Sequence, residues 1–123
     1  MINASEIVDR YLAAWNEADG RRRRDLIGET FAEQATYRDP AQAGTGRDGI
    51  DTMIAGAQAR FAGLRFERIG DVDTHNGYVR FRWSLSPAGG ESIVEGTDFA
   101  TIVDDRFDTV TGFFDKLHAA LAA

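Results

Sequence analysis

Apolar residues in the first third of the chain recur at the spacing of helices. Ile7, Tyr11 and Trp15 follow one another at four-residue intervals, so they share one face of a helix that we predict over residues 3–19. Because Tyr11 belongs to this apolar face, we expect its side chain to point into the core. Asp19 can cap a second helix, which carries Phe31 on its apolar side.

A third helix and a series of strands follow. The helix shows apolar residues at i, i+3, i+4, i+7 and i+11, namely Ile50, Met53, Ile54, Ala57 and Phe61. Before it, Thr36 and Tyr37 favour a short strand that Pro40 stops. After it, residues 64–72, 78–86, 92–103 and 107–114 predict four long antiparallel strands, with a hairpin at Asn76-Gly77. This order predicts one α+β domain over residues 1–123, whose sheet curls around the helices and leaves a pocket.

Composition narrows the class of protein. The net charge of −6 disfavours binding to nucleic acid or to an anionic membrane, and no apolar run is long enough to cross a bilayer. The chain has no cysteine, which excludes thiol catalysis and disulfides. We interpret the run Arg21–Arg24 as the solvated first turn of a helix. The N-terminus lacks the apolar core of a signal peptide, so we expect a cytoplasmic protein.

Candidate chemistry is confined to a few acidic and phenolic residues. Neither His75 nor His118 has a partner at metal-ligand spacing, and the sequence lacks a phosphate-binding glycine loop. We therefore expect neither a metal nor a cofactor. Asp98 is unusual because aspartate is disfavoured inside strands. Asp39 follows a strand and precedes a proline.

Each of these residues also has an ordinary interpretation. Tyr11 can be a core residue, Asp39 can start an Asp-Pro turn, and Asp98 can lie on the outer sheet face beside Arg80 or Arg82. If all three converge on one apolar pocket, burial raises the pKa of Asp98 until the acid is neutral at pH 7. An aspartate at the rim, such as Asp39, then stays charged and can act as a base.

The sequence resembles the nuclear-transport-factor-2-like superfamily, and within it the SnoaL-like and ketosteroid-isomerase-like branch. The resemblance covers nearly the whole chain and rests on six short segments: Asp9-Arg10-Tyr11, residues 35–40, Gly46-Arg47-Asp48, His75-Asn76-Gly77, Gly96-Thr97-Asp98 and Gly112-Phe113-Phe114. It implies a cone-shaped curved antiparallel sheet wrapped around three helices, with a deep pocket. It also implies a homodimer.

The resemblance further implies roles for three residues. In ketosteroid isomerase, a tyrosine and a protonated aspartic acid bind the enolate oxygen while a second aspartate moves the proton. That enzyme is a standard example of two aspartic acids that differ in protonation state and take separate roles, so these roles are carried over from it. By position they fall on Tyr11, Asp98 and Asp39 respectively. At the positions of that enzyme's supporting tyrosines, this chain has Phe31 and Ile54-Ala55.

Two functions of different class remain open. One is a cofactor-independent enzyme, an isomerase or a cyclase, that moves a proton next to a carbonyl of a steroid-, polyketide- or terpenoid-like substrate. The pocket walls are then expected to be Trp15, Phe31, Tyr37, Ile54, Phe61, Phe81, Trp83 and Phe114. The alternative is a carrier that binds apolar ligands without turnover. The outer face with Tyr78, Arg80 and Arg82 is either a solvated strand face or the interface of the expected homodimer.

Overall fold

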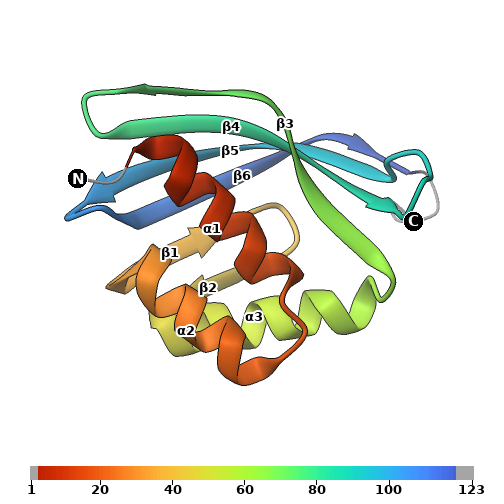
Figure 1. Ribbon diagram of the computed structural model, residues 1–123, viewed down its shortest axis with the longest axis horizontal. Coiled ribbons are helices and arrows are strands. Elements are labelled where there is room, and N and C mark those ends of the chain that lie inside the picture. Colours follow the sequence, from red (N-terminus) through yellow and green to blue (C-terminus); the bar gives the residue numbers. More distant parts are fainter. Residues whose placement is uncertain (1–2, 119–123) are drawn as a thin grey trace.

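The computed structural model describes residues 3–118, which fold as three helices against one face of a curved sheet (Figure 1). The elements are α1 (Ala4–Asn16), α2 (Gly20–Thr30), β1 (Phe31–Arg38), β2 (Ala43–Thr45), α3 (Gly46–Arg60), β3 (Leu64–His75), β4 (Tyr78–Pro87), β5 (Val94–Val103) and β6 (Arg106–Leu117). The predicted α+β fold class is confirmed. The expected domain also includes residues 1–2 and 119–123, which lie outside the described part of the chain.

The six described strands are ordered β2-β1-β6-β5-β4-β3. Adjacent strands are antiparallel except β1 and β6, which run parallel. The expectation of antiparallel pairing throughout is therefore wrong for this one pair. The chain between β1 and β6 passes through α3 and four strands, which gives it the length that a parallel connection needs. Irregular register in β3–β4 and β5–β6 adds to the bending of the sheet.

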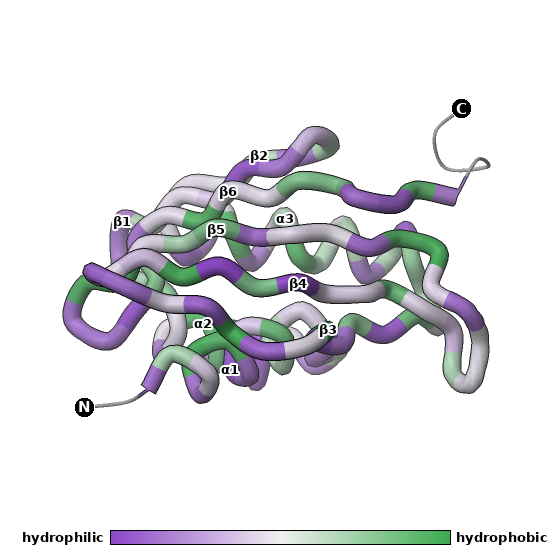
Figure 2. The backbone as a smooth tube through the Cα atoms, turned by 90° about the horizontal axis from the view of Figure 1, so that it is seen from above, coloured by the Kyte–Doolittle hydropathy of each residue, from purple (hydrophilic) through white to green (hydrophobic). Residues whose placement is uncertain are grey.

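The two faces of β4 differ as the alternating sequence predicts. Val79, Phe81, Trp83 and Leu85 are buried, whereas Tyr78, Arg80 and Arg82 are exposed. Figure 2 shows this as alternating hydrophobic and hydrophilic colours along the strand. The helices cover only the face that carries the buried set, so any cavity between helices and sheet is bordered by these inward side chains.

Helix α1 ends three residues earlier than predicted, and Asn16 explains why. Its side-chain amide donates to the Phe66 carbonyl at 2.9 Å, and its side-chain oxygen accepts the Phe66 amide at 2.8 Å. This pair fastens the end of α1 to β3. Asp19 caps α2 as predicted, with its carboxylate accepting the Arg22 amide at 3.3 Å.

The interpretation of the arginine run as solvated is wrong for one member. Arg23 is buried, and its Nε donates to Asp51 at 2.7 Å while its Nη1 donates to Gln58 at 3.0 Å. These contacts join α2 to α3. A buried guanidinium needs such partners because an unpaired charge in the interior is costly.

The outer face of the sheet carries both ion pairs and exposed aromatic rings. Arg80 pairs with Asp73, and Arg82 lies 3.3 Å from a carboxylate oxygen of Glu95. Phe99 and Phe113 are exposed and contact each other edge-on. The homodimer expected through this face stays a prediction. Among residues 3–118, no helix is long and apolar enough to cross a membrane.

Candidate functional site

A cavity of about 350 Å³ lies between α1, α3 and the concave face of the sheet. Its inner end is formed by the buried side chains of Tyr11 and Asp98. Its outer end reaches exposed residues, among them Ala41 and Arg60. The wall between the two ends is mainly aromatic and aliphatic, so the cavity suits an apolar molecule that meets polar groups at its inner end.

Asp98 points into the protein and is 1% exposed, which excludes the outer-face interpretation. Its Oδ2 accepts the Tyr11 hydroxyl at 2.7 Å, and its Oδ1 accepts Trp83 Nε1 at 3.0 Å. Burial raises the pKa of Asp98 to about 6, while the two donors oppose that shift. This is the direction expected for a buried acid. Neutrality of Asp98 at pH 7 stays a prediction, because burial favours the neutral form while the two donors stabilise the charged form.

Glycine makes this arrangement possible at β5. A Cβ atom at Gly96 would lie 2.3 Å from the Trp83 ring and 2.7 Å from the Phe113 carbonyl oxygen. Only a residue without a side chain lets the indole lie across β5, where its N–H reaches Asp98. The short segment Gly96-Thr97-Asp98 thus supplies both the acid and the space for the donor beside it.

A second glycine separates the two candidate acids. Gly112 pairs with Asp98 across the β5–β6 ladder. A Cβ atom at Gly112 would lie 2.8 Å from Asp98 Oδ1, 3.2 Å from Asp39 Cβ and 3.5 Å from the Tyr37 hydroxyl. Asp98, Asp39 and Tyr37 therefore surround one backbone position. Because Tyr11 is hydrogen-bonded to Asp98, the structure brings together all three residues predicted as catalytic.

Asp39 is held at the end of β1 by local hydrogen bonds. The Tyr37 hydroxyl donates to its Oδ2 at 2.5 Å, and the amides of Ala41 and Gln42 donate to its Oδ1 at 2.7 and 3.0 Å. The two amide bonds show that the turn interpretation is also correct. Because Oδ1 accepts two donors, Oδ2 is the oxygen with a lone pair left for a ligand.

Both tyrosines of the site are donors rather than bases. Burial raises the pKa of Tyr11 well above its ordinary value, and the negative charge of Asp98 raises it further. Burial also raises the pKa of Tyr37, with the charges of Asp98 and Asp39 adding to the effect. Each phenol therefore stays protonated over the working pH range and gives its hydrogen to an acceptor.

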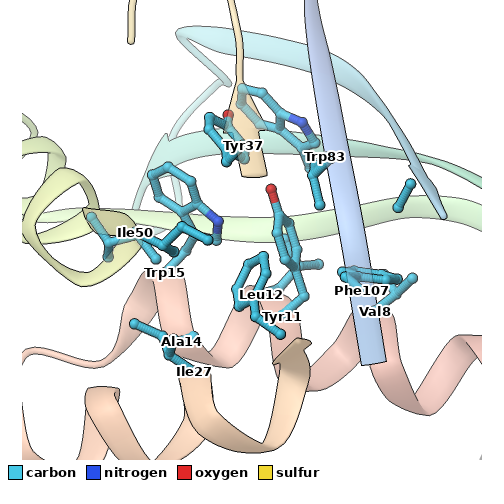
Figure 3. Close-up of a cluster of buried hydrophobic side chains, with 14 of the residues drawn as sticks. Val8, Tyr11, Leu12, Ala14, Trp15, Ile27, Tyr37, Ile50, Trp83 and Phe107 are labelled. Atoms are coloured by element: carbon cyan, nitrogen blue, oxygen red, sulfur yellow. The ribbon is translucent and has the colours of Figure 1, made fainter. Parts of the chain in front are cut away.

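Trp15 contributes a polar atom that sequence reasoning treated only as part of a wall. Its ring contacts those of Tyr37 and Phe66, with centroids 5.5 and 5.2 Å apart. Figure 3 shows its indole nitrogen on the side that faces Tyr11. This nitrogen is buried and lies near the Tyr11 hydroxyl oxygen, but it makes no well-formed hydrogen bond in the described part of the chain.

Five of the eight predicted wall residues line the cavity: Trp15, Tyr37, Phe61, Trp83 and Phe114. Phe31, Ile54 and Phe81 do not, and each is at most 1% exposed. Phe31 begins β1 rather than lying on α2. The rings of Phe31 and Phe81 pack against Tyr11, with centroids 5.8 and 5.4 Å away, so Tyr11 lies between them and the cavity.

Ile54 misses the cavity because a neighbouring stripe of α3 faces it. That stripe includes Ala57 and Arg60. Sequence reasoning missed Arg60 and also Phe66, which lines the cavity from β3. Phe66 carried a usable signal, because it alternates with charged neighbours and so belongs to an inward face. Arg60 had none, since an arginine at the end of a helix is commonplace.

Comparison with known proteins places the fold in a family. The model of the SnoaL-like domain matches residues 8–109. The chain belongs to the SnoaL-like family. No curated protein matches the chain.

Solved structures agree with this family assignment. One is named as a candidate isomerase of the SnoaL-like family from Agrobacterium tumefaciens; it is 42% identical, with 89% of this chain and 95% of that chain covered and a TM-score of 0.85. A candidate polyketide cyclase from Sinorhizobium meliloti is 23% identical, with 87% and 93% covered and a TM-score of 0.69. A protein of ketosteroid-isomerase-like fold from Catenulispora acidiphila is 21% identical, with 98% and 92% covered and a TM-score of 0.76. The latter two show likeness of fold alone.

Proposed function

We propose that this SnoaL-like protein moves a proton at the carbon next to a carbonyl group of an apolar substrate. The observation that carries the proposal is the pair of Tyr–Asp hydrogen bonds, Tyr11 to Asp98 and Tyr37 to Asp39, on the wall of one apolar cavity. The name of the 42% identical Agrobacterium protein, a candidate isomerase, supports the same class of reaction.

The proposed reaction begins at the rim of the cavity. Asp39 Oδ2 removes the α-proton, and the electrons of the broken C–H bond move onto the carbonyl oxygen to form an enolate. Asp39 then holds the proton and returns it to a different carbon of the same molecule in an isomerisation. In a cyclisation the enolate carbon instead attacks a second carbonyl of the substrate. Either route suits steroid-, polyketide- or terpenoid-like ketones.

The inner end of the cavity stabilises the enolate oxygen. In the unliganded site, Asp98 accepts the Tyr11 hydroxyl. Negative charge forming at the inner end disfavours a second anion there, so the reacting complex is the one in which Asp98 is already neutral, a form that its raised pKa of about 6 makes accessible, and Asp98 keeps this proton throughout the reaction. The Tyr11 hydroxyl is then free to donate to the enolate oxygen. Hydrogen bonds aimed at such developing charge are a large source of catalysis.

The test is exchange of the α-protons of 2-tetralone in heavy water, followed by proton NMR. This readout requires proton transfer alone, so it covers isomerase and cyclase chemistry alike. We expect wild type to exchange these protons faster than buffer and Asp39→Asn to lose roughly 10²–10⁴-fold of that rate. Asparagine keeps an oxygen for the Ala41 and Gln42 amides, so the turn survives. Equal rates in wild type, variant and buffer over a panel of ketones would remove the enzymatic proposal.

A non-catalytic carrier is the second candidate, and one observation favours it. All four oxygens of Asp39 and Asp98 already accept a hydrogen bond from the protein. Such a site can be a stable polar lining for a bound ketone or phenol. The carrier predicts tight binding of these ligands, seen as quenching of tryptophan fluorescence, without exchange of α-protons above the buffer rate.

The proposed setting is a cytoplasmic homodimer joined through the outer sheet face, where Phe99 and Phe113 are exposed. Burying these rings in an interface removes apolar surface from water. Sedimentation of wild type beside Phe113→Asp tests the dimer. We expect a two-subunit mass for wild type and a one-subunit mass for the variant.

A further inference from the structure

We infer that the ligand of this cavity has an apolar body, an acceptor oxygen at its inner end and a single carboxylate at its outer end. The inference rests on the proposed function in one respect, because it takes the ligand oxygen at the inner end to be the oxygen of the reacting carbonyl group. It comes from two donors that line the same cavity, one buried and one exposed, and that make no well-formed hydrogen bond among the described residues.

The inner donor is the indole N–H of Trp15. Trp15 is 5% exposed, and its Nε1 lies near the Tyr11 hydroxyl oxygen but makes no well-formed hydrogen bond in residues 3–118. A buried donor without a well-formed hydrogen bond is costly, so a group that accepts its hydrogen is favoured. The neighbouring Tyr11 hydroxyl is committed to Asp98. A ligand oxygen placed between Trp15 and Tyr11 gives the N–H its acceptor and gains the Tyr11 hydroxyl when Asp98 becomes protonated.

The outer donor is the guanidinium of Arg60. It lines the cavity, and no ion pair or hydrogen bond joins it to any residue that the structure describes. The central carbon of the guanidinium, Cζ, lies 5.2 Å from the centre of the Phe61 ring, which also lines the cavity. Stacking on Phe61 holds the planar guanidinium at the entrance while its N–H groups stay available. By contrast, Arg68, Arg80 and Arg82 each have a carboxylate partner.

The surroundings of Arg60 favour one carboxylate over a phosphate. A guanidinium binds a carboxylate through two parallel hydrogen bonds. Arg60 lies in the last turn of α3, where backbone carbonyls carry partial negative charge that repels multiply charged anions. The protein as a whole is acidic, with a net charge of −6, and Asp39 lies on the same cavity wall. A preference for an anionic ligand must therefore come from Arg60 itself.

Calorimetric binding of four related probes tests both ends without requiring turnover. The probes are naphthalene, 2-naphthol, 6-hydroxy-2-naphthoic acid and the methyl ester of that acid. For wild type we expect 2-naphthol to bind more tightly than naphthalene, and the acid to bind about fivefold to tenfold more tightly than its ester. Added salt should reduce the second preference but not the first.

Variants separate the two contacts. Trp15→Phe should remove most of the preference for 2-naphthol over naphthalene while leaving the acid-to-ester ratio unchanged. Arg60→Met should bring the acid-to-ester ratio to one or below. Arg21→Met is the matched control, because Arg21 is exposed on α2, lines no part of the cavity and carries the same charge. It should keep the wild-type ratio.

Two results would overturn the inference. One is an ester that binds wild type as tightly as the acid, and the other is an acid preference that survives in Arg60→Met. A preference for 2-naphthol that Trp15→Phe leaves intact would likewise refute the inner contact. The binding preferences require no turnover, which keeps these outcomes apart from the proposed reaction. Wild type that shows both preferences but exchanges no 2-tetralone protons above the buffer rate would support this inference and remove the proposed reaction.

Discussion

The two ends of the cavity hold the same pair of side chains in different surroundings. At the inner end Tyr11 donates to Asp98 across 87 positions of sequence, and the second donor is an indole from another strand. At the rim Tyr37 donates to Asp39 only two positions away, and the other donors are backbone amides of the following turn. The inner pair depends on the whole fold, whereas the rim pair is built by one short segment.

This difference explains how two aspartates can take separate roles. A half-buried position keeps Asp39 in contact with solvent, and its Oδ1 accepts two backbone amides of the following turn. Asp98 is shielded from solvent, and its pKa is raised to about 6 mainly by burial. A carboxyl group with a raised pKa can change its protonation state when a ligand brings charge nearby. The rim acid is thus suited to exchange protons with a substrate, and the inner acid to adapt to the oxygen.

Of the changes that compare the two ends of the cavity, removal of the Tyr11 hydroxyl should have the largest effect. Tyr11→Phe deletes the donor that the enolate oxygen is proposed to use and leaves Asp98 with one donor fewer. We expect α-proton exchange of 2-tetralone to fall roughly 10²–10³-fold, the usual cost of losing one such donor. NMR exchange rates measure the effect, with heavy-water buffer as the baseline. A fall of less than tenfold would show that Tyr11 does not contact the reacting oxygen.

The stability of the fold should depend on pH through the inner acid. Burial raises the pKa of Asp98 from 3.8 to about 6, so the stability that the neutral acid contributes is present below pH 4 and lost as the pH rises through 6. The variant Asp98→Asn has no carboxyl group that titrates at this position. We expect wild type to lose about 2 kcal/mol relative to this variant between pH 4 and pH 8. Urea unfolding of both proteins across this range gives the difference, and a constant difference would mean that Asp98 titrates normally.

The spacing between the Tyr11–Asp98 and Tyr37–Asp39 pairs can be disturbed by a substitution at Gly112. Gly112→Ala places a methyl group 2.8 Å from Asp98 Oδ1 and 3.2 Å from Asp39 Cβ. We expect the free energy of unfolding to fall by about 1–3 kcal/mol and both ends of the cavity to be displaced. The control is Gly28→Ala in α2, where the new atom meets nothing within 4 Å. It should raise the stability by up to about 1 kcal/mol, since alanine favours helix.

The smallest effect is expected for the rim phenol. Tyr37→Phe leaves Asp39 with its two amide donors, so the carboxylate stays in place and only the bond to Oδ2 is lost. We expect exchange of 2-tetralone to change by less than about tenfold in either direction. A loss as large as that of Tyr11→Phe would contradict the claim that the rim pair is locally supported.

Much of the fold could be read from periodicity, because burial imposes it. The inward face of β4 and the apolar face of α1 were predicted from alternation and from four-residue spacing, and both are confirmed. The parallel pairing of β1 with β6 could not be predicted this way. Pairing direction depends on where the chain returns in space, and local patterns do not record it.

The candidate site shows the same limit: local patterns indicate individual residues but not the contacts between distant ones. Asp39 and its turn follow from an Asp-Pro sequence, and the oddity of Asp98 is visible as a charge inside an apolar strand. The contacts of Asp98 are not visible, because Trp83 reaches it only where Gly96 leaves space. Sequence patterns also assigned too many residues to the cavity wall. Phe31 and Phe81 have the right character, yet they pack behind Tyr11.

The most direct measurement is the titration of the Asp98 side chain itself. Carbon NMR of protein labelled at the aspartate carboxyl carbons follows this group, and Asp98→Asn identifies its signal. We expect a midpoint near pH 6 in the unliganded protein and a higher midpoint when 2-naphthol is bound. A midpoint at about pH 4 or below, unmoved by 2-naphthol, would contradict this expectation, because such an acid could not take up a proton when charge forms on the ligand oxygen.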